Sequence, residues 1–364
     1  MNRDTERLIN PYLLRLQAYT PITPVEVLSE YSGIPIEGVI KLDGNENPYG
    51  CSPKVQRALA HYLRYHIYPD PEQRDLRKAL SEYVGISSEH IVVGSGSDEL
   101  IDLVSRLFIG VGDKAINCVP TFGMYPFSTQ VCGGEVVEVP RNRNFAISVA
   151  KIKAALDKLT KVIFLASPNN PTGNITPQRD ILELVETGII VVVDEAYYEF
   201  SGETVAPLVS QYDNLIVLRT FSKWAGLAGL RVGYGIFPQK ITSYISRIKS
   251  PYNVNVAAQL AALESLQEID YLKDKIRAIL KERERLFAKL KEIPFLRPFP
   301  SQANFVLCSV QDGKAKEIYG QLRQRGIFIR YFDTPLLKDY LRISVGKPRD
   351  TDALIEALRE IESK

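Results

Sequence analysis

Val191-Val-Val-Asp194-Glu-Ala-Tyr197 is the most informative stretch of the sequence, because an uninterrupted apolar run ends there on a carboxylate. The run begins at about Ile189, and further apolar runs alternate with longer helical patterns, at Lys114–Val119, Val136–Val139, Lys161–Ala166 and Leu215–Leu218. Strands that are apolar throughout are typical of a parallel sheet covered on both faces, and intervening helices are typical of crossover connections. The sequence therefore predicts an α/β protein, a three-layer sandwich with a mostly parallel sheet.

The pattern changes after residue 270. A long charged helix is predicted from about Leu272, because apolar residues recur on one face, at Ile276, Ile279, Leu280, Leu286, Phe287 and Leu290. After three prolines come predicted strands at Asn304–Cys308, Ile327–Tyr331 and Tyr340–Val345, and helices at Lys316–Gln324 and from Thr351. We therefore expect an N-terminal arm (1–40) that packs on a neighbour rather than forming a core of its own, a large domain (41–270) and a small α+β domain (271–364).

Composition and charge exclude several classes of protein. The 364 residues carry 45 Lys and Arg against 43 Asp and Glu, so the net charge of +2 provides no field that attracts nucleic acid or an anionic membrane. No apolar run reaches the roughly 20 residues that span a bilayer, and residues 1–11 lack the apolar core of a signal peptide. We expect a cytosolic protein.

The cysteines and histidines predict neither a metal site nor a disulfide framework. The cysteines are scattered without a C-x-x-C pair, and the histidines lie in polar stretches, at Cys51, Cys118, Cys132, Cys308, His61, His66 and His90. Zinc sites and disulfide frameworks have clustered spacings that this chain lacks. We expect no bound metal and no histidine-based catalysis.

Arg219-Thr-Phe-Ser-Lys223 places a lysine just after the predicted strand at residues 215–218. Small and apolar residues follow it, so its amine is poorly solvated, which lowers its pKa and exposes a nucleophile. Amine nucleophiles form Schiff bases with carbonyl groups. The alternative is that Lys223 is a strand-end lysine that reaches solvent.

Asp194 stands at the carboxyl end of an all-apolar strand. Ligands of open α/β sheets bind outside those strand ends, so Asp194 points to the site. A carboxylate there can keep a pyridine nitrogen protonated and make the ring an electron sink. The alternative is that Asp194 caps the next helix.

Two loops follow other predicted strands. Ser167-Pro-Asn-Asn170-Pro-Thr-Gly173 is dense in residues that favour a tight turn. Val93-Gly-Ser-Gly-Ser97-Asp98-Glu99 leads from a short strand into a helix, where backbone N–H groups and two hydroxyls suit a phosphate. The alternative is that Ser97 is a helix N-cap without a ligand.

These four elements occur in a fixed order, and each follows a predicted strand. The chain thereby resembles the fold-type I enzymes that use pyridoxal 5'-phosphate (PLP), and within them the histidinol-phosphate aminotransferases, from Tyr19 to Gly346. The resemblance is carried by Leu42-Asp-Gly-Asn-Glu-Asn-Pro-Tyr-Gly50, Tyr68-Pro-Asp-Pro71, Gly96-Ser-Asp-Glu-Leu100, Pro120-Thr-Phe-Gly-Met-Tyr125, Ser167–Gly173, Asp194–Tyr197, Ser222-Lys223 with Arg231, and Leu341-Arg-Ile-Ser344.

The resemblance implies three catalytic residues and PLP as the cofactor. Lys223 is expected to carry PLP as a Schiff base and, once displaced by the amino substrate, to move the proton. Asp194 is expected to pair with the pyridine nitrogen. Tyr197 and Asn170 are expected to hydrogen-bond the phenolic oxygen of the cofactor.

The resemblance also implies the remaining cofactor contacts. The phosphate is expected to be bound by the segment after the strand at residue 93 and by the lysine loop, through Ser97, Asp98, Thr220, Ser222 and Arg231. Phe122 is expected to stack on the pyridine ring, where many relatives carry tyrosine. Tyr49 is expected to reach the phosphate from the second subunit of a homodimer.

For the substrate, the resemblance implies one anion pocket. Arg342 is expected to bind the carboxylate of the amino donor by a bidentate contact, and Arg330 and Tyr19 to join it around the phosphate of histidinol phosphate. Asn170 and Tyr252 are expected nearby, with Asn253 beside Tyr252. The implied reaction moves the amino group of L-histidinol phosphate to 2-oxoglutarate.

Three other functions remain open at this point. Aromatic amino-acid aminotransferases and a threonine-phosphate decarboxylase of cobalamin synthesis share the cofactor motifs, so those motifs do not separate the substrates. A non-catalytic, PLP-sensing regulator is disfavoured, because no helix-turn-helix or basic face precedes residue 40.

Overall fold

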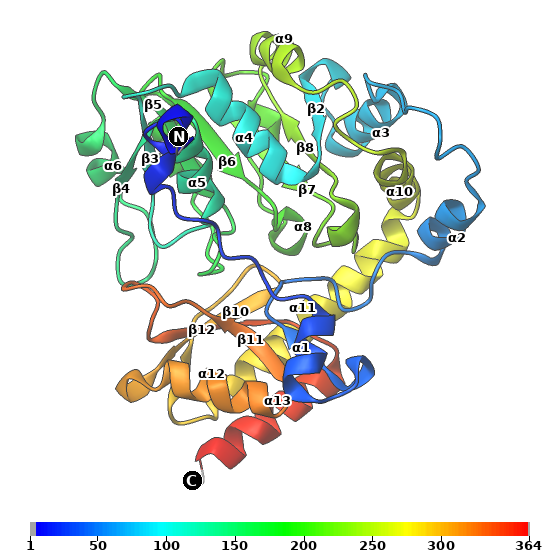
Figure 1. The fold of residues 1–364 in the computed structure, drawn as a ribbon, viewed down its shortest axis with the longest axis vertical. Coiled ribbons are helices and arrows are strands. Elements are labelled where there is room, and N and C mark those ends of the chain that lie inside the picture. Colours follow the sequence, from blue (N-terminus) through cyan, green and yellow to red (C-terminus); the bar gives the residue numbers. More distant parts are fainter. Residues whose placement is uncertain (1–4, 363–364) are drawn as a thin grey trace.

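Seven strands form the larger sheet of the computed structural model, which describes residues 5–362 (Figure 1). They are β2 (Ile91–Gly94), β3 (Lys114–Asn117), β4 (Glu135–Glu138), β5 (Thr160–Ala166), β6 (Ile190–Asp194), β7 (Leu215–Thr220) and β8 (Gly233–Ile236). Their order is β2-β8-β7-β6-β5-β3-β4. β8 runs antiparallel to β2 and β7, whereas the other neighbours are parallel.

Helices cover both faces of this sheet. One face packs against α4 (Gly96–Phe108), α5 (Met124–Val131) and α9 (Gln239–Ile248). The other is covered by α3 (Arg74–Val84), α6 (Val149–Ala155), α7 (Gln178–Val185) and α10 (Val256–Gln267), and α2 (Pro53–His61) packs on α10. In β6, Val192 belongs to the core under α4, while Val191 and Val193 belong to the opposite core. Both sides of each central strand are therefore apolar, and the predicted three-layer α/β sandwich with a mostly parallel sheet is confirmed.

A smaller sheet lies below the first (Figure 1). It contains β1 (Ile40–Leu42), β9 (Leu296–Pro298), β10 (Phe305–Val310), β11 (Ile327–Tyr331) and β12 (Tyr340–Ser344), in the order β1-β11-β12-β10-β9. α12 (Ala315–Gln324) and α13 (Pro348–Glu362) pack on it, and α11 (Ile269–Lys291) runs from the larger part into the smaller one. β1 pairs in parallel with β11, so this segment joins the smaller sheet, although the sequence analysis places residue 41 at the start of the large domain.

The N-terminal segment spans both parts of the molecule. It starts beside α5 and β3 and runs down to α1 (Val25–Ser32), which lies against the smaller part (Figure 1). The remaining short helices are α8 (Tyr198–Ser201) and the 3-10 turns η1 (Glu6–Leu8), η2 (Leu13–Arg15), η3 (Ile36–Gly38), η4 (Ser88–His90), η5 (Ala206–Leu208), η6 (Ala228–Leu230) and η7 (Gln311–Gly313).

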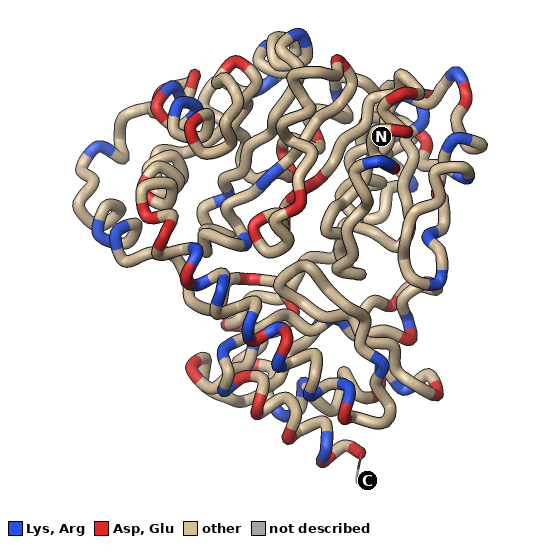
Figure 2. The backbone as a smooth tube through the Cα atoms, turned by 180° about the vertical axis from the view of Figure 1, so that it is seen from behind, with Lys and Arg blue, Asp and Glu red and all other residues tan. Residues whose placement is uncertain are grey.

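Charges are mixed over the whole molecule. Figure 2 shows basic and acidic residues interspersed along the chain in both parts. Between residues 5 and 362, no helix combines the length and the apolar character that a membrane crossing needs.

Candidate functional site

The expected site residues gather at the carboxyl ends of β6 and β7. Asp194 is the last residue of β6 and Thr220 the last of β7, and Lys223 follows three positions later. Asp194 lies between Ala166 of β5 and Leu218 of β7 in the sheet register. Since parallel strands end at one edge, the sheet brings together groups that are far apart in sequence.

Lys223 is a partly buried amine at this edge. Its Nζ donates a hydrogen bond to the carbonyl oxygen of Gly44 at 3.0 Å. Burial, followed by the positive charge of Arg342, lowers the pKa of Lys223 from 10.5 to about 8. Near neutral pH the amine is therefore unprotonated far more often than an exposed lysine, which makes it both a nucleophile and a base.

Asp194 is 4 % exposed, and both its oxygens accept hydrogen bonds from neutral donors. Oδ2 accepts from the phenol of Tyr125 at 2.8 Å, and Oδ1 accepts from the backbone N–H of Ala196 at 3.0 Å. Burial raises the pKa of Asp194 to about 6, while the two hydrogen bonds oppose this rise. A buried carboxylate with neutral partners is suited to pair with a protonated ring nitrogen.

Tyr197 lies beside Asp194 and is also buried. Its Oη accepts a hydrogen bond from Nδ2 of Asn45 at 2.9 Å, and burial raises its pKa to about 12. The phenol therefore stays protonated and can donate. Asn45 is tied in turn to the smaller sheet, because its backbone N–H donates to Oγ of Ser344 at 2.9 Å.

A polar cradle surrounds the N-terminus of α4. Arg231 donates to Oδ2 of Asp98 at 2.8 Å and to Oγ of Ser222 at 3.4 Å, and Thr220 donates to the same Ser222 oxygen at 3.0 Å. Ser97 lies buried in the first turn of the helix. A guanidinium, several hydroxyls and the N–H groups of a helix start together suit a phosphate.

The backbone of the cradle leaves no room for a side chain. A Cβ on Gly96, whose φ is +79°, would lie 2.5 Å from Nη2 of Arg231, and one on Gly233 would lie 2.6 Å from the backbone nitrogen of Ser97. Arg231 itself has a φ of 53°, which is uncommon for a residue with a side chain. The residues present therefore fit a compact anion such as the phosphate of PLP.

Arg342 reaches the site from β12 of the smaller sheet. It is 5 % exposed, and its guanidinium donates to Oδ1 of Asn170 at 2.6 Å and to the carbonyl oxygen of Asp43. Among the described residues, no acceptor lies within hydrogen-bond distance of its Nε. Burial lowers the pKa of Arg342. A buried guanidinium with neutral acceptors is suited to bind a carboxylate or a phosphate.

Arg330 lies directly opposite Arg342 in the β11–β12 pair. Its guanidinium donates to the carbonyl oxygens of Thr20 at 3.1 Å and Pro21 at 3.5 Å, so it holds the N-terminal segment against the site. Like charges opposite one another on paired strands repel. A bound anion between the two arginines offsets that repulsion.

Two aromatic residues, Tyr19 and Phe122, form a pair at the site that lies next to Tyr125. Tyr19 packs edge-on against Phe122, with ring centroids 6.2 Å apart. Phe122 lies edge-on to Tyr125 at 5.7 Å, and so stands next to the partner of Asp194. The structure thus brings both expected aromatic residues to the site.

Two expected residues lie elsewhere in this chain. The ring of Tyr49 faces the amines of Lys275 and Lys347, at 5.4 and 5.8 Å, rather than the cradle. Tyr252 is 45 % exposed and stacks on Tyr68, with ring centroids 4.5 Å apart. Their assignment to a site stays a prediction, and for Tyr49 it requires a second subunit.

Several residues of the site had no role in the sequence analysis. Tyr125, Asn45 and Asp43 contact Asp194, Tyr197 and Arg342, as described above. Asn169, which is fully buried, accepts from Thr121 at 2.6 Å and from Arg141 at 3.1 Å, and so fixes the loop that carries Asn170. Their motifs gave a signal, because all but Arg141 lie within the quoted stretches at 42–50, 120–125 and 167–173.

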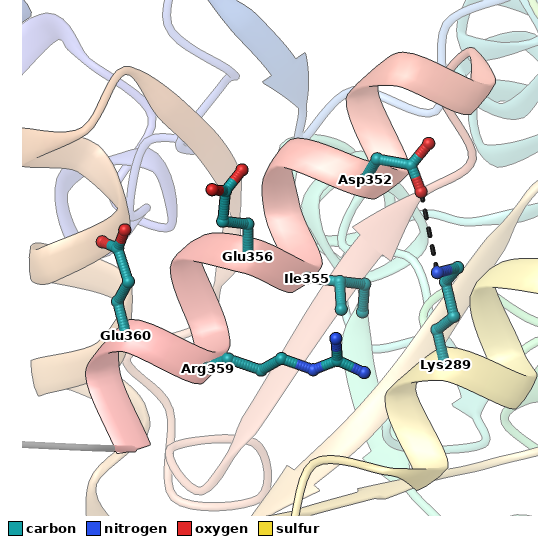
Figure 3. Close-up of a pocket in the computed structure, with 6 residues that line it drawn as sticks. All are labelled: Lys289, Asp352, Ile355, Glu356, Arg359 and Glu360. Atoms are coloured by element: carbon teal, nitrogen blue, oxygen red, sulfur yellow. Dashed lines mark ion pairs between the residues drawn. The ribbon is translucent and has the colours of Figure 1, made fainter.

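A separate groove of about 590 Å³ lies between α11 and α13 (Figure 3). Lys289 lies 3.7 Å from Asp352 in this groove (Figure 3), and Arg359 lies 2.8 Å from Glu292, so these charged groups already pair. Within residues 5–362, no group of three or more His, Cys, Asp or Glu could hold a metal ion. The chemistry is therefore assigned to the sheet edge.

Comparisons with known proteins agree with this geometry. The sequence profile of the family "Aminotransferase class I and II" matches residues 37–358. The chain is 51% identical to a histidinol-phosphate aminotransferase of Dehalococcoides mccartyi, over 89% of this chain and 90% of that protein. It is 50% identical to the chloroplastic histidinol-phosphate aminotransferase 1 of Arabidopsis thaliana, over 98% of this chain and 86% of that protein.

A solved structure has the same fold. The histidinol-phosphate aminotransferase of Sinorhizobium meliloti, in complex with pyridoxal-5'-phosphate, superposes with a TM-score of 0.87 and 27% identity, and the match covers 97% of this chain and 98% of that one. Fold, site and sequence thus agree, and the chain belongs to the aminotransferase class I and II family.

Proposed function

We propose that this chain is a PLP-dependent aminotransferase that moves the amino group of L-histidinol phosphate to 2-oxoglutarate, giving imidazole acetol phosphate and L-glutamate. The observation that carries the proposal is the buried guanidinium of Arg342, placed opposite Arg330 and close enough to Lys223 to lower its pKa. The names of the relatives support the substrate. The phosphate cradle supports the cofactor.

Three groups of the chain would hold PLP. The cradle around Arg231 and Ser222 would bind its phosphate, Asp194 would face the pyridine nitrogen, and Lys223 would hold it covalently through Nζ. Bound PLP supplies an electron sink for the substrate carbon. Tyr197 and Asn170 are within the same site and would donate hydrogen bonds to the phenolic oxygen.

Lys223 is the group that moves the proton. Its pKa of about 8 keeps a useful fraction of the amine unprotonated near neutral pH, which is what a general base requires. Where the amine is free, the hydrogen bond from Nζ to the Gly44 carbonyl holds it in one place. Lys223 therefore serves first as nucleophile and then as base.

The two arginines would let one pocket accept two different anions. Arg342 offers paired N–H donors to the carboxylate of glutamate. Histidinol phosphate has no carboxylate, so its phosphate would take that place, with Arg330 and the phenol of Tyr19 beside it. Because Arg330 donates to Thr20 and Pro21, an anion bound there would also contact the N-terminal segment.

The assembly is proposed to be a homodimer with shared active sites. In this chain Tyr49 lies away from the cradle of its own subunit, as expected of a residue that serves the partner. A cytosolic location remains a prediction from the sequence.

Substrate spectra of the PLP-loaded protein test the proposal. L-Histidinol phosphate, L-phenylalanine and L-threonine phosphate are added separately, and absorption and released carbon dioxide are recorded. We expect histidinol phosphate to convert the cofactor to its amine form fastest. Faster conversion by phenylalanine would indicate an aromatic aminotransferase, and carbon dioxide from threonine phosphate would indicate a decarboxylase; either result overturns the substrate assignment.

A further inference from the structure

Tyr125 has no role in the reaction proposed above, yet it makes the shortest side-chain contact to Asp194. It is the second residue of α5 and is 1 % exposed. Its phenol donates to Oδ2 of Asp194 at 2.8 Å. Burying a hydroxyl without a hydrogen-bond partner costs free energy. Asp194 is the only acceptor described for this hydroxyl, so the contact stabilises the folded chain.

The ring of Tyr125 is fixed before the hydroxyl meets Asp194. It stacks on Phe164 of β5, with centroids 5.1 Å apart and planes only 2° from parallel. Phe122 packs against its edge at 5.7 Å. With the ring held on two sides, the hydroxyl has little freedom, and the carboxylate that accepts from it is held at one rotation.

The two donors to Asp194 come from different directions. Ala196 belongs to the turn that follows β6 and constrains Oδ1, whereas Tyr125 comes from α5, which packs on β3 and β4, and constrains Oδ2. Because Oδ1 accepts from the turn and Oδ2 accepts from α5, the plane of the carboxylate is fixed. The hydrogen bond from Ala196 alone would leave Oδ2 without a partner.

The negative charges near Asp194 disfavour its ionised form, so the hydrogen bond from the Tyr125 hydroxyl is needed to favour it. Besides Tyr125, the titratable groups that face it are Asp98 at the start of α4, and Glu195 and Tyr197 on its own segment. The two acids disfavour the charged form of Asp194, as burial does. Burial also raises the pKa of Tyr125 well above its usual range, so the phenol stays a donor.

We propose that Tyr125 is a positioning residue for the cofactor ring: its hydroxyl sets the rotation of the Asp194 carboxylate and favours its ionised form. The inference rests on PLP being the cofactor. In this proposal the stretch Pro120–Tyr125 contacts the cofactor ring in two ways. Phe122 is expected against the face of the pyridine ring, and Tyr125 orients Asp194, which pairs with the ring nitrogen.

The test compares Tyr125→Phe, which keeps the ring contacts, with Tyr83→Phe as a matched control. The phenol of Tyr83 is only part-buried, and it donates to Glu199 at 3.4 Å and not to Asp194. Thermal unfolding of the PLP-free proteins is followed from acidic to mildly alkaline pH. We expect the loss of stability caused by ionisation of Asp194, which begins near its unfolded pKa of 3.8, to extend to higher pH in Tyr125→Phe and to vanish in Asp194→Asn. The part of the profile that Asp194→Asn removes should keep its wild-type range in Tyr83→Phe.

PLP affinity provides the second readout. We expect Tyr125→Phe to weaken PLP binding about tenfold, a change of about one charge-assisted hydrogen bond. A PLP analogue with carbon in place of the ring nitrogen should bind equally well to the variant and the wild type. Equal losses for both ligands, together with a pH-independent loss of stability, would mean that Tyr125 only packs, and would overturn the proposal.

The proposal can still be tested if the Tyr125→Phe variant does not fold. If Tyr125→Phe does not fold but Tyr125→Phe with Asp194→Asn does, the hydroxyl is needed because of the carboxylate, as proposed. If the double variant fails as well, the ring environment alone is at fault and the proposal is wrong. Failure of the wild type to bind PLP would instead refute the proposed cofactor, while the unfolding data on the PLP-free protein would still test the contact.

Discussion

Three ionisable side chains at the sheet edge are buried where their charged forms are disfavoured. Burial raises the pKa of Asp194 and lowers the pKa values of Lys223 and Arg342. Perturbed groups of this kind gather at functional sites, because binding and proton transfer need groups that solvent does not already satisfy. Without the cofactor they reduce stability, and their presence argues for function rather than for packing.

Asp194→Asn is expected to stabilise the PLP-free protein. Because the pKa of Asp194 is raised from 3.8 to about 6, the folded protein binds more protons than the unfolded chain between these values, and stability falls as pH rises through the window. A rise of about two pKa units lowers the free energy of unfolding by about 3 kcal/mol at a pH where Asp194 is ionised in both the folded protein and the unfolded chain.

Thermal unfolding of wild type and Asp194→Asn as a function of pH measures this effect. The advantage of the asparagine variant should be small near pH 4, grow up to about pH 6 and then level off. An advantage that does not change with pH would show that Asp194 does not titrate in this window.

At the scale of elements, the strands of the larger sheet could be predicted because their apolar character is continuous. β3, β4, β5, β6 and β7 lie within two residues of their predicted bounds at every end, and burial on both faces explains why. The helix predicted from Thr351 begins three residues earlier, at Pro348, which suits the first position of a helix.

Three strands were not predicted, and each has a physical reason. β1 has three residues, and its partner β11 lies far along the chain, with Ile40 opposite Ile327. β8 contains Gly233 and Gly235, which sequence patterns assign to turns. β9 ends on Pro298, and proline is disfavoured within strands because it cannot donate a backbone hydrogen bond. Long-range pairing decides β1 and the β8–β2 pair, whereas β9 pairs with the nearby β10.

Part of the site could likewise be predicted from the sequence. Asp194 ends β6 and Lys223 lies just after β7, so local sequence indicates their location, whereas the family resemblance indicated Arg231. Tyr125 and Asn45 act through partners that are 69 and 152 positions away, and no local pattern indicates such contacts.

The β11–β12 pair predicts different outcomes for its two arginines. We expect Arg342→Ala to weaken the use of glutamate by about 10- to 100-fold, since a hydrogen bond to a charged group contributes about 1.5–3 kcal/mol. Arg330→Ala, the matched variant on the neighbouring strand, should weaken the use of histidinol phosphate more than that of glutamate. PLP affinity should change little in either.

Steady-state kinetics with each amino donor, together with PLP titrations, separate these effects. Unchanged glutamate kinetics in Arg342→Ala would show that another residue binds the carboxylate.

At the scale of the whole molecule, the site depends on both parts of the chain. Asp194, Lys223 and the cradle belong to the larger sheet, Arg330 and Arg342 to the smaller one, and the N-terminal segment joins them through Thr20 and Pro21. Relative motion of the two parts would therefore change the distance between the base and the anion pocket.

Shared active sites predict complementation between inactive chains. Lys223→Ala lacks the base, and Tyr49→Ala is expected to lose affinity for PLP in the partner's site. In a hybrid dimer, one site would contain the native lysine of one chain and the native tyrosine of the other. Random mixing makes about half of the dimers hybrid, each with one intact site, so activity should approach about a quarter of the wild-type value.

Activity is measured after unfolding and refolding the two variants together and, as the control, separately. No gain on mixing would contradict a site shared in this way.

The most direct test of the central claim is amino transfer by Lys223→Ala. With saturating L-histidinol phosphate and 2-oxoglutarate, formation of glutamate should fall at least about 10³-fold, because both the covalent attachment and the general base are lost. The variant should still fold and bind PLP noncovalently, since the cradle around Arg231 is intact. Near-normal turnover by Lys223→Ala would contradict the account, because the nucleophile and base would then have to be another residue.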